Sequence, residues 1–237
     1  MSKSELLQIA IAQLKSSLPV EVNLAGLYTR NNVAHKWKVT YFTIVLRESI
    51  CWRFTDLLEQ SFNLGEMGFI SGARIIARAV IETLATLIYL NNEIQSVLDK
   101  KISFYDLGKK LECILVGSRT NKDLPETINV LTIIQKAEKK HPGILKIYEE
   151  LCETTHPSYI SLTRGYTKSN HDVVTTKFGN FWNDSFGKTH QDILLFCIEL
   201  FENEYNNIWD ENFKALEEWL IKHNDLLVNE MKEKLDK

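Results

Sequence analysis

The chain has 237 residues, of which 44% are hydrophobic and 25% charged, the composition of a globular protein that can bury a full core. Its formal net charge of -3 excludes a generic nucleic-acid coat protein, so any nucleic acid would have to meet a local basic patch. Only 4 prolines and 10 glycines occur, and this scarcity favours long helices over a turn-rich β architecture.

Apolar residues recur at helical spacing along most of the chain. Serines before Glu5 predict a capped first helix over roughly 3–18, which ends at Pro19. A loop over 20–28 separates it from a long helix that we expect over about 32–62. The later predicted helices cover about 65–92, 104–115, 125–140, 144–155, 189–209 and 210–233.

The 158–182 region differs in kind from these helices. The runs Ser161–Thr167 and Val173–Phe178 are rich in β-favouring residues and bracket a polar segment, a pattern typical of a hairpin or a long ordered loop. Loops of this length inside compact domains are often functional, which makes this one a candidate lid. Because no repeat, low-complexity tract or linker interrupts the chain, we predict one all-α domain over residues 1–237, a multi-helix bundle with this insertion.

The cysteines and the apolar segments bear on the compartment. No Cys-x-x-Cys pair occurs, and each cysteine lies in an apolar helical pattern, which indicates reduced thiols in a cytoplasmic protein rather than a disulfide framework or a zinc site. The most hydrophobic window, Ile75–Leu90, contains Arg78 and Glu82 and is too short to span a bilayer, so we expect no membrane partner. The cysteines are Cys51, Cys113, Cys152 and Cys197.

Three charged residues share one otherwise apolar face of the predicted helix 65–92. Arg74, Arg78 and Glu82 are spaced by four residues, so the helical period stacks them along one side. Such charges are costly to bury unless they are paired or used. Two hypotheses stay open: Arg78 and Glu82 form a structural ion pair, or the three groups hold a phosphate and handle a proton.

A histidine follows the predicted helix 144–155, at the end of the sequence Tyr148-x-x-Leu151-x-x-x-x-His156-Pro-Ser. The helix dipole favours a positive charge at this end. One interpretation of His156 is a C-capping side chain that bonds exposed carbonyl groups. The other is a functional histidine that acts with the arginines of the apolar helix.

These two patterns together resemble an uncharacterised family of bacterial helical proteins, known mainly as a domain of unknown function and found near mobile elements and defence genes. The resemblance spans about residues 35–165. It implies that Arg74, Arg78, Glu82 and His156 converge in one pocket. The matching positions are Arg74, Arg78, Glu82, Tyr148, Leu151 and His156.

The sharpest short match is Arg30-Asn31-x-x-x-His35, at the start of the second predicted helix, 32–62. It resembles the Arg-Asn-x-x-x-His signature of the HEPN ribonucleases, helical bundles of which many are dimeric toxins or antiphage enzymes. In that family the arginine and the histidine assist attack of a ribose 2′-hydroxyl on its own phosphate, so the resemblance implies Arg30 and His35 as the catalytic pair. Neither a metal nor another cofactor is expected, because the RNA supplies the nucleophile. Arg78 with His156 is the alternative pair.

The leading hypothesis is therefore a cytoplasmic, HEPN-like helical protein of a toxin or antiphage defence system, acting as a metal-independent endoribonuclease on RNA. One alternative is a binding or scaffold module without catalysis, and another is a nucleotide sensor that uses the arginines for phosphate. The closing helices carry more apolar positions than one inner face needs, which predicts a homodimer. These positions are Phe196, Phe201, Trp209, Leu216, Trp219 and Leu220.

Overall fold

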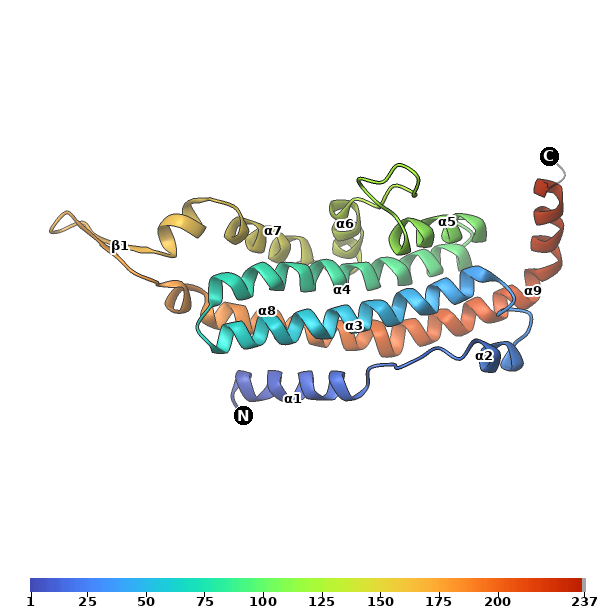
Figure 1. Ribbon diagram of the computed structural model, residues 1–237, viewed down its shortest axis with the longest axis horizontal. Coiled ribbons are helices and arrows are strands. Elements are labelled where there is room, and N and C mark those ends of the chain that lie inside the picture. The colour runs from blue at the N-terminus through green and yellow to red at the C-terminus, as the bar shows by residue number, and fades with distance from the viewer. Residues whose placement is uncertain (236–237) are drawn as a thin grey trace. The chain divides into compact units, whose positions relative to one another are not determined.

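The computed structural model describes residues 1–235, and helices make up most of them (Figure 1). This confirms the predicted all-α, multi-helix class. The small sheet is one antiparallel hairpin, which confirms the hairpin predicted within 158–182. The elements are α1 (Lys3–Ser16), α2 (Leu24–Arg30), α3 (Lys38–Glu66), α4 (Ile70–Leu98), α5 (Phe104–Leu115), α6 (Val130–Lys140), α7 (Ile144–Thr155), the π-helix η1 (Tyr159–Arg164), β1 (Thr167–Asn170), β2 (Thr175–Phe178), α8 (Trp182–Glu202), the π-helix η2 (Asn203–Ile208) and α9 (Trp209–Leu235).

The chain divides into two compact units. The first comprises Met1–Leu18, Ile50–Leu87 and Val130–Glu202, and the second comprises Pro19–Ser49, Ile88–Asn129 and Asn203–Lys237. The helices α3 and α4 each contribute residues to both units without a break. Among the described residues, no helix has the length and apolar composition needed to cross a membrane.

If the chain is one domain, as the absence of a linker predicts, it should unfold in a single transition. Melting of α3 or α4 in one unit would disrupt the same helix in the other, because helix formation is cooperative. We expect urea curves from far-UV circular dichroism and tryptophan fluorescence to coincide. Two separated transitions would contradict the single domain.

The first unit contains an antiparallel pair formed by the ends of α3 and α4 that adjoin their connecting turn. Ser61 Oγ donates to the carbonyl of Ala73 at 2.7 Å, and Arg53 Nε donates to Thr83 Oγ1 at 3.2 Å, so the partners run in opposite directions. The turn between them needs a glycine, because Gly68 adopts a left-handed φ of 81°.

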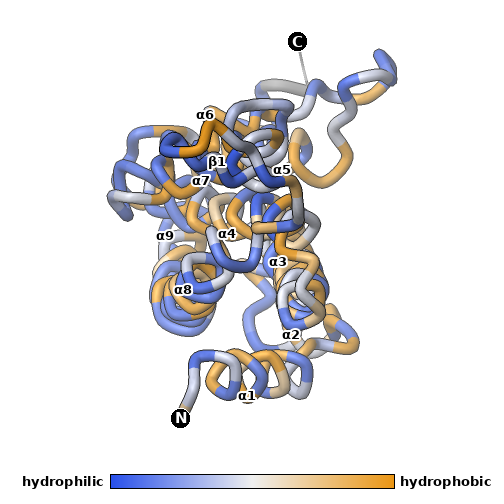
Figure 2. Tube along the Cα trace, turned by 90° about the vertical axis from the view of Figure 1, so that its left-hand side faces the viewer, coloured by the Kyte–Doolittle hydropathy of each residue, from blue (hydrophilic) through white to orange (hydrophobic). Residues whose placement is uncertain are grey.

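Two further helices cover α3 in this unit. On α8, the Phe201 ring stacks on Phe54 of α3 with 3.9 Å between the centroids, and both side chains are fully buried. In Figure 2, hydrophobic and hydrophilic residues follow each other along α1, as expected of a helix with one apolar face. Its buried side chains are Leu7, Ile11 and Leu14.

Polar contacts fix the elements of the second unit. Asn91 Nδ2 on α4 donates to the buried Glu204 carboxylate of η2 at 2.7 Å, and Asn212 Nδ2 on α9 donates to the Asn91 carbonyl at 3.2 Å. On α5, the Tyr105 hydroxyl donates to the Leu227 carbonyl of α9 at 2.7 Å. Buried polar groups need such partners, so these bonds help to define the packing of α4, α5 and α9.

Several boundaries differ from the sequence prediction. The expected loop 20–28 contains α2, which begins where Asn23 Oδ1 accepts from Gly26 N at 2.9 Å. The run Ser161–Thr167, predicted as a strand, belongs mostly to η1 because Ser158 Oγ caps the backbone N–H of Ser161 at 3.3 Å. The helices α6 and α8 begin at Val130 and Trp182, rather than at 125 and 189.

Candidate active site at the Arg30–His35 turn

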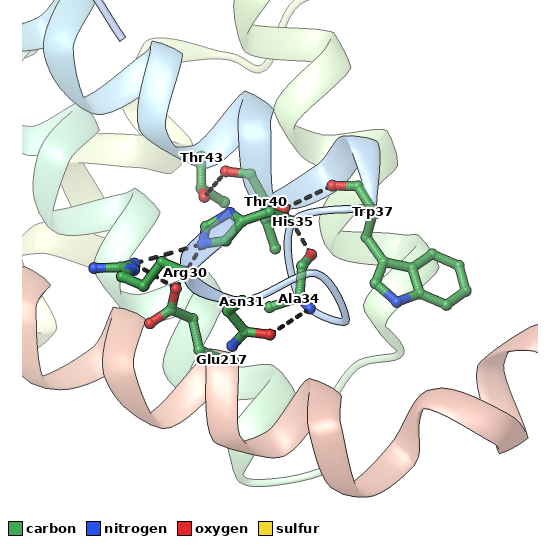
Figure 3. A network of polar contacts seen from close by, with 8 residues as sticks. All are labelled: Arg30, Asn31, Ala34, His35, Trp37, Thr40, Thr43 and Glu217. Atoms are coloured by element: carbon green, nitrogen blue, oxygen red, sulfur yellow. Dashed lines mark hydrogen bonds and ion pairs between the residues drawn. The ribbon is translucent and has the colours of Figure 1, made fainter. Parts of the chain in front are cut away.

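The Arg30 and His35 side chains lie together and share a carboxylate that the sequence analysis did not identify (Figure 3). Arg30 is the last residue of α2, His35 lies in the turn before α3, and Glu217 comes from α9. Glu217 Oε1 lies 2.5 Å from Arg30 Nη2 and 2.7 Å from His35 Nε2. The two nitrogens are 3.5 Å apart. The short motif thus places its arginine and histidine on a single carboxylate oxygen.

The motif occupies a turn and not the start of the predicted helix 32–62. Asn31 Oδ1 accepts from the backbone N–H of Ala34 at 3.0 Å, and the His35 N–H donates to the Asn31 carbonyl at 3.1 Å. Thr40 Oγ1 then donates to the Trp37 carbonyl at 2.6 Å, at the entry to α3. Asparagine side chains compete with helix formation in this way, so Asn31 shapes the turn that positions the histidine.

The three side chains differ in access to solvent. The exposed fraction is 59% for Arg30, 13% for Glu217 and 1% for His35. With Glu217 ionised, the Nε2–H group of His35 donates to it, which leaves Nδ1 as the acceptor nitrogen. That Nδ1 atom is buried and has no hydrogen-bond partner among residues 1–235. A phosphate can therefore reach Arg30 directly, whereas the imidazole needs an opening of the turn.

A second cluster joins α4 to α7 in the first unit. Arg78 Nε donates to Glu82 Oε1 at 3.1 Å, and Arg78 Nη2 donates to the Tyr148 hydroxyl at 3.1 Å. The Arg78 and Glu82 side chains are 26% and 27% exposed. Burial raises the pKa of Tyr148, so its hydroxyl stays protonated at neutral pH. This geometry matches the structural hypothesis for the three charged residues of α4, in which Arg78 and Glu82 form an ion pair.

Arg74 makes different contacts, although it lies on the same face one turn earlier. Its Nη2 donates to Glu150 Oε1 on α7 at 2.8 Å, and its guanidinium carbon lies 5.0 Å from the ring centroid of Phe186 on α8. The Arg74 side chain is fully buried, and burial lowers its pKa. Its Nε and Nη1 atoms have no hydrogen-bond partner in the described part of the chain.

His156 does not join these groups through any polar contact. It is the exposed C-cap residue of α7, and its backbone N–H donates to the Cys152 carbonyl at 3.1 Å. Within residues 1–235, no hydrogen bond or ion pair connects its side chain to Arg74, Arg78 or Glu82. The predicted convergence of all four residues therefore does not take the form of one hydrogen-bonded site.

Replacement of Glu82 by alanine is expected to lower the free energy of unfolding by no more than about 1 kcal/mol. The pair with Arg78 is partly solvated, and Arg78 keeps its bond to Tyr148. A fully buried pair would instead cost about 3–5 kcal/mol on loss of one partner. Urea unfolding of Glu82→Ala beside wild type gives the measurement, and a loss in the higher range would contradict the solvated pair.

A buried histidine that the sequence analysis did not single out lies on α8. His190 lines a polar cavity of about 380 Å³ between the ends of α3 and α8, and its Nε2 lies 3.3 Å from the Ser61 carbonyl. The ring also lies over Gly65 of α3, where an added Cβ would lie 3.2 Å from His190 Cδ2 and crowd the ring. In the sequence it lies in a polar stretch that matches no functional motif and contains Lys188, Thr189, Gln191 and Asp192.

The stability of the protein should depend on pH through His190. Burial lowers the pKa of His190 to about 4, with the Arg74 charge acting in the same direction. The unfolded value is about 6.5, so the unfolded chain binds more protons between these two pKa values. Stability should fall as the pH drops from about 6.5 to about 4, by at most about 1.4 kcal/mol per pH unit. Urea unfolding at several pH values, for wild type and His190→Gln, should show a shallower dependence in the variant.

The chain matches no protein-family model, no curated protein and no solved structure. Within residues 1–235, no group of three or more His, Cys, Asp and Glu side chains is placed to hold a metal ion. The two resemblances noted in the sequence stay predictions.

Proposed function

We propose that the chain is a cytoplasmic endoribonuclease of a toxin or antiphage defence system, with Arg30, His35 and Glu217 as its metal-independent active site. One observation supports this most directly. Arg30 and His35 contact the same carboxylate oxygen of Glu217, and the Arg30 guanidinium is accessible to solvent. A cation for the phosphate and an imidazole for proton transfer are the groups that internal cleavage of RNA needs.

In this mechanism Arg30 binds the scissile phosphate through its fork of N–H groups. The ribose 2′-hydroxyl loses its proton to the imidazole and attacks the phosphorus, and the bond to the 5′-oxygen breaks. The products are a 2′,3′-cyclic phosphate and a 5′-hydroxyl end, which takes up a proton. Glu217 orients His35 and stabilises the imidazolium that forms, as a carboxylate does in other histidine dyads.

Substrate binding must also expose the imidazole. A phosphate on Arg30 competes with Glu217 for the Nη2 group, which contacts Glu217 at 2.5 Å. The segment 31–37 lies outside the helices, so it can move without unfolding α2 or α3, although the contacts of His35 with Glu217 and Phe213 must then break. We infer that this turn opens when RNA arrives.

The proposal is tested by incubating the purified chain with single-stranded RNA, with and without EDTA. We expect cleavage in both conditions and ends that carry a 2′,3′-cyclic phosphate. Cleavage that EDTA abolishes would remove the metal-independent mechanism. If the wild-type protein leaves RNA intact in the presence and absence of EDTA, the ribonuclease proposal is wrong.

The burial of His35 favours a second candidate, a binding or scaffold module without catalysis. With its side chain 1% exposed, the imidazole can act purely as a link between the turn and Glu217 of α9. In that case Glu217→Gln changes stability, and no RNA is cleaved by any form of the protein. The two candidates therefore give opposite results in the cleavage assay.

The proposal includes a homodimer, but most of the apolar residues that predicted it are not available for an interface. Four of the six apolar positions on the closing helices are buried inside the chain, because they pack in its own core. These are Phe201, Trp209, Leu216 and Leu220. Light scattering at tens of micromolar protein tests the assembly, and a monomeric mass would contradict it.

A further inference from the structure

The hairpin is an exposed part of the first unit, and the π-helix before it packs on the rest of that unit through Ile160. We call residues 159–178 the basic hairpin. Antiparallel pairing places Lys168 opposite Lys177 and Thr167 opposite Phe178, and every residue from 168 to 180 is exposed. Figure 1 shows the strands extending beyond the ends of α7 and α8. An isolated two-stranded ribbon is only marginally stable in water, so nothing in the fold itself requires this extension.

The charges of the basic hairpin are arranged unfavourably for a free surface. Like charges directly opposite each other destabilise a strand pair, yet Lys168 and Lys177 occupy such positions. Lys168 is partly neutralised by Asp184, with 2.9 Å between Nζ and Oδ2. The Lys177 side chain makes no hydrogen bond or ion pair within the described residues. A phosphate group between the two lysines would relieve their repulsion.

A third cation continues this charge toward the π-helix. Arg164, the last residue of η1, has its guanidinium carbon 5.0 Å from the ring of Phe186 and pairs with no carboxylate within residues 1–235. The hairpin thus has three cations against the single carboxylate of Asp172, a net charge of +2 in a chain whose total is -3. Its charge is complementary to a polyanion.

Aromatic side chains alternate with these cations. Tyr159 is 71% exposed, Tyr166 is 41% exposed and Phe178 is 82% exposed. Phe178 directly follows Lys177 in β2, so the two side chains lie on opposite faces of the narrow ribbon, and an RNA strand that crosses its edge can place a base on the ring and a phosphate at the lysine. Exposed rings beside cations are the pattern with which proteins bind single-stranded nucleic acid.

We propose that the basic hairpin binds single-stranded RNA, with Arg164, Lys168 and Lys177 at phosphates and Phe178 stacked on a base. The choice of RNA rests on the proposed ribonuclease function, for which this surface would hold the substrate. A membrane fits less well. The exposed Val173 and Val174 at the tip follow Asp172, and hydroxyl side chains fill the strands, so no continuous apolar face exists on the ribbon.

The test is fluorescence anisotropy of a short labelled single-stranded RNA, titrated with the full chain carrying His35→Ala to prevent cleavage. Phe178→Ala should weaken binding about five- to 100-fold, because stacking is lost. Lys177→Ala should reduce the slope of log affinity against log salt by about 0.7, the value for one phosphate contact on a single strand. The matched controls are Val20→Ala, an exposed apolar residue, and Lys146→Ala, an exposed lysine of α7, which should change neither quantity.

The outcomes separate this inference from the proposed function. If wild type cleaves RNA but the hairpin variants bind as tightly as the controls, the inference is wrong and the ribonuclease stands. If nothing is cleaved and the hairpin variants still weaken binding, the hairpin is an RNA-binding surface of a non-catalytic protein. Absence of RNA binding together with flotation on phosphatidylserine vesicles, lost in a Val173→Ser and Val174→Ser double variant, would overturn the inference in favour of a membrane.

Discussion

His35→Ala is expected to slow RNA cleavage by about 10²–10⁴-fold, the usual contribution of general acid–base catalysis by a histidine. The effect should fall on the chemical step measured at saturating RNA, because Arg30 and not His35 is the accessible group for the phosphate. Arg30→Ala should instead also weaken RNA binding. Single-turnover cleavage of a labelled RNA gives both quantities.

The controls for His35→Ala must account for its burial. The sequence predicts His35 and His156 at the ends of helices, but the His35 ring is buried against Phe213, with 6.1 Å between ring centroids. His35→Asn keeps a polar side chain in the turn and cannot exchange the proton, so it separates loss of folding from loss of chemistry. His156→Ala, at an exposed position, should retain full activity and identical circular dichroism. Full activity in His35→Asn, or its loss in His156→Ala, would exclude Arg30 and His35 as the catalytic pair.

Local sequence patterns predicted most of the helices and two of the three residues of the candidate site. Arg30 and His35 are five residues apart, so the chain brings them together within one turn, and their proximity followed from the motif. Glu217 lies 182 residues from His35, and the sequence offered several acidic side chains on the same closing helix. Which of them meets the turn is decided by the packing of α9 in the second unit, which has no local signature.

The arginines of α4 show the same limit within a single helix. Their spacing correctly places Arg74 and Arg78 on one face, but it does not determine their partners. Arg74 contacts Glu150 and the Phe186 ring. Arg78, one helical turn later, contacts Tyr148 and is partly exposed to solvent. Burial therefore differs between them, from 0% to 26% exposed, although their sequence surroundings are nearly equal. That difference comes from α7 and α8, which approach α4 unequally along its length.

Because Arg74 is the more deeply buried of the two arginines, its partner Glu150 is the partly exposed residue whose substitution should destabilise the protein most. Glu150→Ala is expected to lower the free energy of unfolding by about 1–3 kcal/mol, because it leaves the fully buried Arg74 guanidinium without a counter-charge, although the Glu150 side chain itself is 39% exposed and partly solvated. Two nitrogen atoms of Arg74, Nε and Nη1, already have no hydrogen-bond partner in the described chain, so no other hydrogen bond compensates for the loss of Glu150. Glu149→Ala, on the exposed side of α7, is the matched control and should cost less than about 1 kcal/mol.

Removal of the cation should reverse this loss. Arg74→Met replaces the guanidinium by an apolar side chain that still contacts Phe186, and substitutions of this kind are often neutral or stabilising. In the Arg74→Met background, Glu150→Ala should then cost no more than Glu149→Ala does, a strong non-additivity that a double-mutant cycle in urea measures directly. Equal losses from Glu150→Ala in both backgrounds would show that the carboxylate stabilises α7 in some way other than by balancing Arg74.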